Sequence, residues 1–436
     1  MFCVRKFTIS RRSALILVVF LGLIGIGGLV IKGVPLLEKI GKAVDKKTYF
    51  VMLQNSSELR ATGGFMGSYV RLKLYKFGIS ELLIQDIYVP DGKLMGHVEP
   101  PYPVQEAFGQ GWWKLRDANW EVDFPKSAKA ITWFLEQAGE NVDGVAVVNI
   151  SLVQKWLEAL GEVRSQTYDE TVTAKNLYSL AQKYAEINWT AGSTQKRDFL
   201  GAVGVALLEK TKQASLMQKL KLVRLFWGEL QKGQILVWVK DEAVEKEILQ
   251  RKWGGELIVP GESNFLYVVE SNLGANKANC CVIRKITQEI NQESEQIIIN
   301  WQNNNPFENP RPPIFWGGDY LDYVRVVVDK EATNIKVAVD GRSLRLGTDK
   351  DFVIANSLRQ GLSEEMFVVK EGEIGFWAKV PAGKEVIVKI NFDTTGKDRV
   401  FVKRQPGIES FAYNLIVDGK LVTNTIIDRD TEFGPW

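Results

Sequence analysis

The segment at residues 55–69 carries charge and glycine where a strand connection needs neither. Glu58 and Arg60 precede Gly63, Gly64 and Gly67, and the segment joins two apolar runs that both have the pattern of strands. Glycine lets a backbone approach another group closely, and arginine binds anions with a planar fork of donors. This pattern predicts an anion contact. The alternative is a glycine-rich connection in which Glu58 and Arg60 pair in solvent.

A second segment places four polar residues within eight positions, immediately before a predicted helix. Arg116, Asp117, Asn119 and Asp123 lie in the stretch that ends at Pro125. Carboxylate and amide oxygens are ligands of divalent cations, so this spacing predicts a metal site. In the alternative, Asp123 forms a turn and Asp117 neutralises Arg116. The sequence leaves both interpretations open.

A third segment places cations where a helix begins. Ser193 or Thr194 is expected to cap a helix, which puts Lys196 and Arg197 in its first turn. Cations at this end oppose the helix dipole, whereas a bound phosphate would be stabilised by the same backbone amides. Phosphate binding is therefore one interpretation, and exposed basic residues offset by Asp198 are the other.

The order of strand and helix patterns predicts the scaffold that carries these segments. Alternation of this kind is typical of a mixed α/β sheet covered by helices, expected over residues 48–260. After about residue 260 only short strand patterns separated by turn residues remain, so residues 261–436 are predicted to form an all-β, sandwich-like domain. The expected strands of the first part are at 49–53, 66–74, 79–88 and 142–148, and its main helices at 125–138, 152–160, 173–187 and 194–212.

An uncharged apolar run of eighteen residues, 14–31, predicts one membrane anchor. At about 1.5 Å per residue a helix of this length reaches roughly 27 Å, which just crosses a bilayer core. Four cations lie before the run, so the N-terminus is expected in the cytoplasm and the bulk of the chain outside. The expected divisions are a cytoplasmic stub at 1–12, a transmembrane helix at 13–32 and a stalk at 33–47.

Composition excludes several function classes. The formal net charge is +3, and the first twelve residues carry +4, which leaves −1 for the rest and argues against a nucleic-acid partner. The single histidine makes histidine-based metal sites and catalytic triads improbable. Outside the anchor the only cysteines are Cys280 and Cys281, which we expect to be buried strand residues without a disulfide.

Three stretches resemble the signature motifs of a bacterial membrane family, domain-of-unknown-function family 4012. They are Glu-Leu-Arg-Ala-Thr-Gly-Gly-Phe-Met-Gly-Ser, Arg-Asp-Ala-Asn-Trp-Glu-Val-Asp-Phe-Pro and Lys-Arg-Gln-Pro-Gly at 403–407. The order of elements from 49 to about 210 is distantly similar to the LytR-CpsA-Psr proteins, enzymes that move glycopolymers from a polyprenyl pyrophosphate carrier onto peptidoglycan. In that resemblance Asp86 keeps the place of an aspartate, whereas Gln85 and the glycine stretch replace an arginine and a metal-binding aspartate.

The resemblance implies two functions. As a Mg²⁺-dependent phosphotransferase at the cell membrane, the protein would act on polyprenyl-pyrophosphate-linked glycopolymer, with peptidoglycan as acceptor. As a non-catalytic protein, it would bind envelope glycan on a degenerate transferase scaffold. The enzyme hypothesis assigns catalysis to Asp86 and Asp117, metal binding to Asp86, Asp117 and Asp123, and substrate binding to Arg60, Gly63, Gly64, Arg116, Asn119, Lys196 and Arg197.

Overall fold

The computed structural model describes residues 46–75, 78–109, 111–165, 167–187, 195–311, 316–348 and 364–436, with only the backbone described for residues 78, 79 and 186. The chain forms two compact units. Unit 1 contains residues 66–95 and 115–256 together with the chain up to Asn55. Unit 2 contains residues 56–65, 96–114 and 257–436. The chain therefore leaves unit 1 after its first strand, contributes ten residues to unit 2 and then returns.

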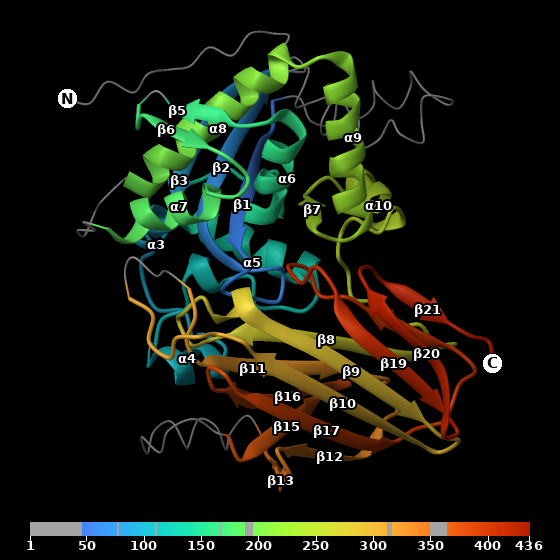
Figure 1. Ribbon diagram of the computed structural model, residues 1–436. Helices are drawn as coiled ribbons and strands as arrows, with labels where there is room; N and C mark the ends of the chain where they lie inside the picture. Colours follow the sequence, from blue (N-terminus) through green and yellow to red (C-terminus); the bar gives the residue numbers. More distant parts are fainter. Residues whose placement is uncertain are drawn as a thin grey trace. The chain divides into compact units, whose positions relative to one another are not determined.

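Unit 1 contains a five-stranded mixed sheet in the order β3-β2-β1-β4-β7. β1 and β4 are parallel, whereas β2–β3 and β4–β7 are antiparallel pairs (Figure 1). The mixed sheet expected from the alternating strand and helix patterns is confirmed. The strands are β1 (Thr48–Asn55), β2 (Phe65–Tyr75), β3 (Gly78–Asp86), β4 (Gly144–Asn149) and β7 (Ile235–Val239).

Helix α5 (Phe124–Gln137) shows why the local pattern predicted most helices of unit 1, although α3 (Tyr88–Asp91) was not predicted and the expected strand 79–88 ends at Asp86. Asp123 is its N-cap and proline stands in its first turn, where a missing N–H removes no helical bond. Ala128, Ile131 and Leu135 form its buried face. The other helices are α3 (Tyr88–Asp91), α6 (Ile150–Leu160), α7 (Leu177–Glu186), α8 (Gln195–Gln213), α9 (Leu216–Gln231) and α10 (Glu242–Gln250), with a short hairpin of β5 (Val163–Ser165) and β6 (Glu170–Val172) and the 3-10 turn η1 (Leu115–Asp117).

Unit 2 is built on two seven-stranded sheets, which confirms the expected all-β character of the C-terminal part. The first sheet has the order β13-β12-β17-β10-β9-β19-β20, and the second β14-β15-β16-β11-β8-β18-β21 (Figure 1). The strands are β8 (Asn264–Asn272), β9 (Val282–Ile290), β10 (Ser294–Asn303), β11 (Tyr320–Val327), β12 (Thr333–Val339), β13 (Arg342–Ser343), β14 (Arg345–Leu346), β15 (Met366–Lys370), β16 (Glu373–Val380), β17 (Glu385–Asp393), β18 (Val400–Lys403), β19 (Phe411–Val417), β20 (Lys420–Ile427) and β21 (Thr431–Phe433).

One continuous apolar core fills unit 2. On β10 and β17 the burial alternates with every residue, so Ile297, Ile299 and Trp301 point inward while their neighbours point outward. Strand β8 is buried at all nine positions. The sequence predicted seven of the fourteen strands of this unit, namely β8, β9, β10, β11, β16, β17 and β19. It did not predict β12, β13, β14, β15, β18, β20, β21 or the helix α4 (Tyr102–Phe108).

The prediction for the two adjacent cysteines is wrong. Cys280 is exposed and Cys281 half-buried, and the structure joins them in a disulfide. They lie in the 3-10 turn η2 (Ala278–Cys281) just before β9 begins, not in the strand itself. In a strand, neighbouring side chains point to opposite faces, whereas a turn relaxes that constraint.

The predicted anchor at 13–32 and the stalk at 33–47 lie almost entirely outside the described residues. Within the described ranges, none of the helices combines the length and the apolar character that a membrane span requires.

Candidate functional site

The carboxylate of Asp86 organises the turn at the end of β3. Its Oδ1 accepts a hydrogen bond of 2.9 Å from the backbone N–H of Tyr88, the residue at which α3 begins. A side-chain acceptor two residues before the donor is the arrangement of an Asx turn. Asp86 therefore shapes the entrance to α3 in unit 1.

A cluster of charged side chains lies where α3 meets η1 in unit 1. Asp91, the last residue of α3, accepts hydrogen bonds from the backbone N–H of Leu115 at 2.7 Å and from Arg116 Nη1 at 3.2 Å. Arg116 Nε also lies 3.5 Å from Asp117 Oδ2. The Asp91 and Asp117 side chains are 5% and 8% exposed, so the arginine joins two largely buried carboxylates. The ring of Tyr88 lies 5.5 Å from the Arg116 guanidinium carbon.

Asp91 is a member of this cluster that the sequence did not predict. It occurs in a Pro-Asp-Gly turn signal, which by itself indicates only a change of chain direction. Its pairing with Arg116, twenty-five residues later in the chain, depends on how the two segments fold together.

The Mg²⁺ site expected at Asp86, Asp117 and Asp123 stays a prediction. Mg²⁺ requires several oxygen ligands in near-octahedral geometry. Within the part of the chain that the structure describes, no group of three or more His, Cys, Asp or Glu side chains could hold a metal ion. The guanidinium of Arg116 supplies the positive charge between Asp91 and Asp117 instead. We therefore derive no chemistry through a metal at these residues.

Asn119 and Asp123 are the two remaining polar residues of the stretch that ends at Pro125. Asn119 is fully buried. Asp123 stands at the N-cap of α5, where its backbone carbonyl accepts from the N–H groups of Lys126 at 3.0 Å and Ser127 at 3.2 Å. Both residues therefore lie on the path of the chain from η1 into α5.

The basic pair at 196–197 lies in the first turn of α8, as the sequence predicted. Arg197 forms an ion pair with Asp198 at 2.8 Å, and its side chain is 29% exposed. Helix α8 packs against β3. A Cβ added at Gly204 of α8 would lie 3.3 Å from Ile84 Cδ1 of β3. Arg197 and Asp86 thus belong to neighbouring elements of unit 1. The expected capping residues 193 and 194 lie outside the described residues.

Arg60 is placed in unit 2, where it holds the backbone of a strand. The side chain is 4% exposed, and its Nη1 donates to the carbonyl oxygens of Leu59, at 3.0 Å, and Asn272. Gln405 Nε2 donates to the Arg60 carbonyl at 3.0 Å and to the Glu270 carbonyl at 2.8 Å. The side-chain amide of Gln405 therefore joins two of the signature stretches through the Arg60 carbonyl.

The glycines of the first segment serve a close approach between two backbones. Gly63 has a φ of 125°, a conformation that favours glycine. Gly407, with a φ of 84°, lies so close to Gly63 that an added Cβ would collide with the Gly63 carbonyl. Gly64 belongs to the same ten-residue insertion. The glycine-rich pattern thus indicated a real close approach, and its partner in the structure is the 403–407 stretch.

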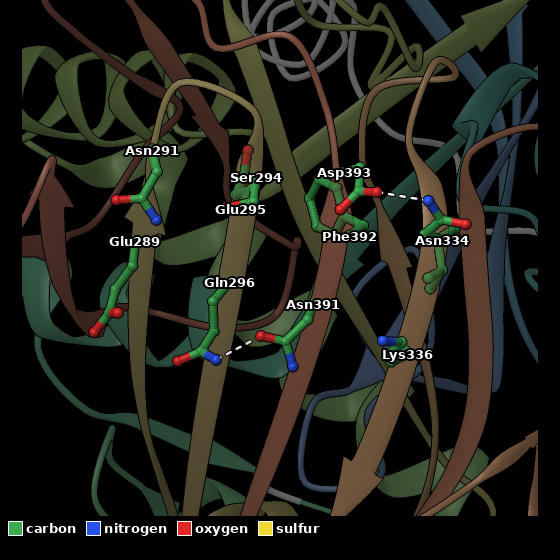
Figure 2. Close-up of a pocket in the computed structure, with 11 residues that line it drawn as sticks. Glu289, Asn291, Ser294, Glu295, Gln296, Asn334, Lys336, Asn391, Phe392 and Asp393 are labelled. Atoms are coloured by element: carbon green, nitrogen blue, oxygen red, sulfur yellow. Dashed lines mark hydrogen bonds between the residues drawn. The ribbon is translucent and has the colours of Figure 1, made fainter.

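A polar groove of about 570 Å³ lies on the first sheet of unit 2. Figure 2 shows its side chains on four adjacent strands, β9, β10, β17 and β12. The pairing register aligns Glu289, Gln296, Asn391 and Lys336 in one row across these strands. Sequence reasoning did not find this row, because only the register of strands far apart in the chain creates it.

Amide groups dominate the middle of this groove. Gln296 Nε2 donates to Asn391 Oδ1 at 2.5 Å, and Asn334 Nδ2 donates to Asp393 Oδ2 at 2.6 Å (Figure 2). Each amide has two N–H donors and a carbonyl acceptor, so one bond between two amides leaves further donors and acceptors for a ligand. The groove can therefore form many hydrogen bonds, and its charges are of both signs.

One family model matches about a third of the chain. Residues 45–185 match the family described as protein of unknown function DUF4012. The resemblance to this family is confirmed for that stretch. No curated protein matches the chain.

Several solved structures match about half of the chain at low identity and low TM-score. Protein gbs0355 from Streptococcus agalactiae is 13% identical, with a TM-score of 0.31 over 49% of this chain and 75% of that chain. Lin1025 from Listeria innocua is 12% identical, with a TM-score of 0.27 over 51% and 85%. TagV from B. subtilis is 16% identical, with a TM-score of 0.26 over 48% and 81%.

Proposed function

We propose that this protein binds a glycan of the cell envelope and that unit 2 carries the binding groove. The observation that carries the proposal is the row of amide and charged side chains across β9, β10, β17 and β12. Adjacent strands lie about 4.8 Å apart, so a row over four strands is about 14 Å long. A ligand with donors and acceptors along its whole length, such as an oligosaccharide, matches this row.

The groove carries charges of both signs, which favours a ligand without a strong net charge. Glu289 and Asp393 are negative and Lys336 is positive, and the amides of Gln296 and Asn391 lie between them. A polyphosphate would meet two carboxylates here and only one cation. Neutral sugar hydroxyls, which both donate and accept, suit the amides better.

A glycopolymer phosphotransferase is the second candidate. It is favoured by the basic first turn of α8, a helix that crosses the strand ending at Asp86. A phosphate at that turn would be stabilised by the helix N-terminus. The ion pairs of Arg116 with Asp91 and Asp117 weigh against this candidate, because phosphoryl transfer relies on carboxylates that hold metal ions.

Binding of full-length protein in detergent micelles to insoluble peptidoglycan and to soluble N-acetylglucosamine oligomers tests the first candidate. Asn391→Ala should weaken binding about tenfold, as expected for lost hydrogen bonds in a partly desolvated groove. Gln302→Ala is the matched control, because Gln302 is exposed on the same face of β10 but outside the groove. Equal binding by Asn391→Ala and the parent protein would contradict the groove as the binding site.

A second assay separates the two candidates. Full-length protein is incubated with a polyprenyl-pyrophosphate-linked oligosaccharide, with and without Mg²⁺, and released polyprenyl phosphate is measured. The glycan-binding proposal predicts no release in either condition. Release that depends on Mg²⁺ and is lost in Arg197→Ala would establish the phosphotransferase instead.

A further inference from the structure

The start of α9 exposes large apolar side chains to solvent. Leu216 and Met217 are each 73% exposed, and Leu220 is 45% exposed. Positions three and four apart lie on one face of a helix, so these three residues form a single surface, here called the α9 tip. Most large apolar side chains of unit 1 are buried or half-buried, and a grouped exposure of this kind indicates an interaction surface.

The α9 tip is held in a fixed position. Ser215 caps the helix: its Oγ accepts from the Gln218 N–H at 3.3 Å, and Gln218 Oε1 accepts from the Ser215 N–H at 3.0 Å. This capping box starts α9 immediately after the turn from α8 (Figure 1). Leu216 and Met217 are therefore the first two residues of an ordered helix.

Cations follow the α9 tip at the distance of about one helical turn. Lys221 lies four residues after Met217, and Arg224 lies four residues after Leu220. At about 1.5 Å per residue, these charges sit about 6 Å further along the same face. Both side chains are exposed. Apolar groups at the end of an element with cations one turn behind them suit insertion to the depth of lipid headgroups.

The whole α8–α9 turn is basic. Residues 209–224 contain five lysines and arginines and one acidic residue, Glu209. Lys212 pairs with Glu209, and Lys219 Nζ donates to the Lys212 carbonyl at 3.0 Å, so the basic side chains remain close to the turn. This excess of positive charge complements anionic phospholipid headgroups, which attract nearby lysine and arginine side chains.

If the apolar run at 14–31 spans a membrane, the short stretch of chain between that run and unit 1 limits how far unit 1 can lie from the membrane. Fourteen residues separate Ile31, the last residue of that run, from Lys46. Fully extended, they reach at most about 50 Å. The start of unit 1 then lies within about 50 Å of that membrane.

We propose that the α9 tip docks on an anionic membrane surface, where the tip enters the headgroup region and Lys221 and Arg224 contact lipid phosphates. This contact would orient unit 1 on the membrane that anchors the chain. It does not depend on the glycan groove, which belongs to unit 2.

The test uses the full-length protein in nanodiscs of phosphatidylglycerol with brominated acyl chains. A bimane fluorophore is attached at Met217→Cys in a Cys3→Ser background, and quenching by the bromines reports contact with lipid. Met95→Cys is the matched control, because Met95 is 91% exposed in unit 1 and lies outside the α9 tip. We expect quenching at position 217 to be at least about threefold stronger than at position 95.

Charge reversal tests the electrostatic part of the proposal. Lys221→Glu with Arg224→Glu should reduce quenching at position 217 to the level of the control, with an unchanged melting temperature because both side chains are exposed. Zwitterionic phosphatidylcholine nanodiscs should have the same effect on the parent protein. Equal quenching at positions 217 and 95, or equal quenching in both lipids, would overturn the proposal. Preferential disulfide pairing of two Met217→Cys chains in detergent would also overturn it, in favour of a second copy as the occupant.

Discussion

Glu295 is expected to make unit 2 less stable in alkaline solution. It faces inward from β10, is 3% exposed and accepts a hydrogen bond of 2.6 Å from Gln288 Nε2. Gln288 Oε1 in turn accepts from the hydroxyl of Tyr413 at 2.6 Å. Burial raises the pKa of Glu295 from 4.5 to about 8; the charge of Asp329 adds to this effect, while Gln288 and Lys397 oppose it.

The sign of the pH dependence follows from this pKa. Between pH 4.5 and 8 the folded protein keeps a proton on Glu295 that the unfolded chain releases. The stabilisation is complete below the unfolded pKa and is lost as the pH rises through the folded pKa. From pH 6 to 8 the loss is about 1.36 kcal/mol for each pH unit, or about 3 kcal/mol by pH 9.

Glu295→Gln removes the ionisable group and keeps the side-chain shape. The free energy of opening unit 2 is measured at pH 6 and pH 9 from hydrogen–deuterium exchange of β9 and β10 peptides in a urea series, because a chain of two units need not unfold in one step. Between pH 6 and pH 9 the free energy of opening should fall by about 3 kcal/mol more in the parent protein than in Glu295→Gln. Glu293→Gln, an exposed carboxylate in the same hairpin, should behave like the parent. If parent and Glu295→Gln lose the same free energy, the carboxyl is not protonated in the folded state and the reasoning fails.

Three further outcomes test the structure. Arg116→Ala should lower the free energy of unfolding of unit 1 by about 2–3 kcal/mol, because two largely buried carboxylates lose their cation. In urea unfolding, Arg116→Lys should recover part of this lost free energy. Gly407→Ala should destabilise unit 2 by about 3 kcal/mol or more, because the added Cβ collides with the Gly63 carbonyl. Gly383→Ala is the control and should destabilise unit 2 by only about 1 kcal/mol, because Gly383 has a φ of 71° and open space around it. Similar hydrogen-exchange protection in both variants would contradict this packing. Reduction of the Cys280–Cys281 disulfide should leave the melting temperature nearly unchanged, because the bond closes a loop without intervening residues and constrains the unfolded chain little; a drop of many degrees on adding reductant would refute this.

The sequence by itself determined the local elements. Helix α5 was predictable because its apolar residues recur with the helical period between a proline at the start and a glycine after the end. The all-β character of residues after 260 followed from short alternating runs separated by turn residues, and two sheets are present there. Such patterns depend on neighbours within one or two turns, which the sequence contains directly.

Only the tertiary structure decided which of the suggestive residues come together. Arg60 binds the carbonyl of Asn272, 212 positions away, and its own carbonyl accepts from Gln405, 345 positions away. Asp91 joins Arg116 because α3 packs on η1, and Gln296 meets Asn391 only through the register of β10 and β17. Residue type and spacing suggested an anion site for Arg60, yet a guanidinium can also donate to a backbone carbonyl. Which partner it meets depends on contacts between segments far apart in the chain, and local periodicity carries no information about those contacts.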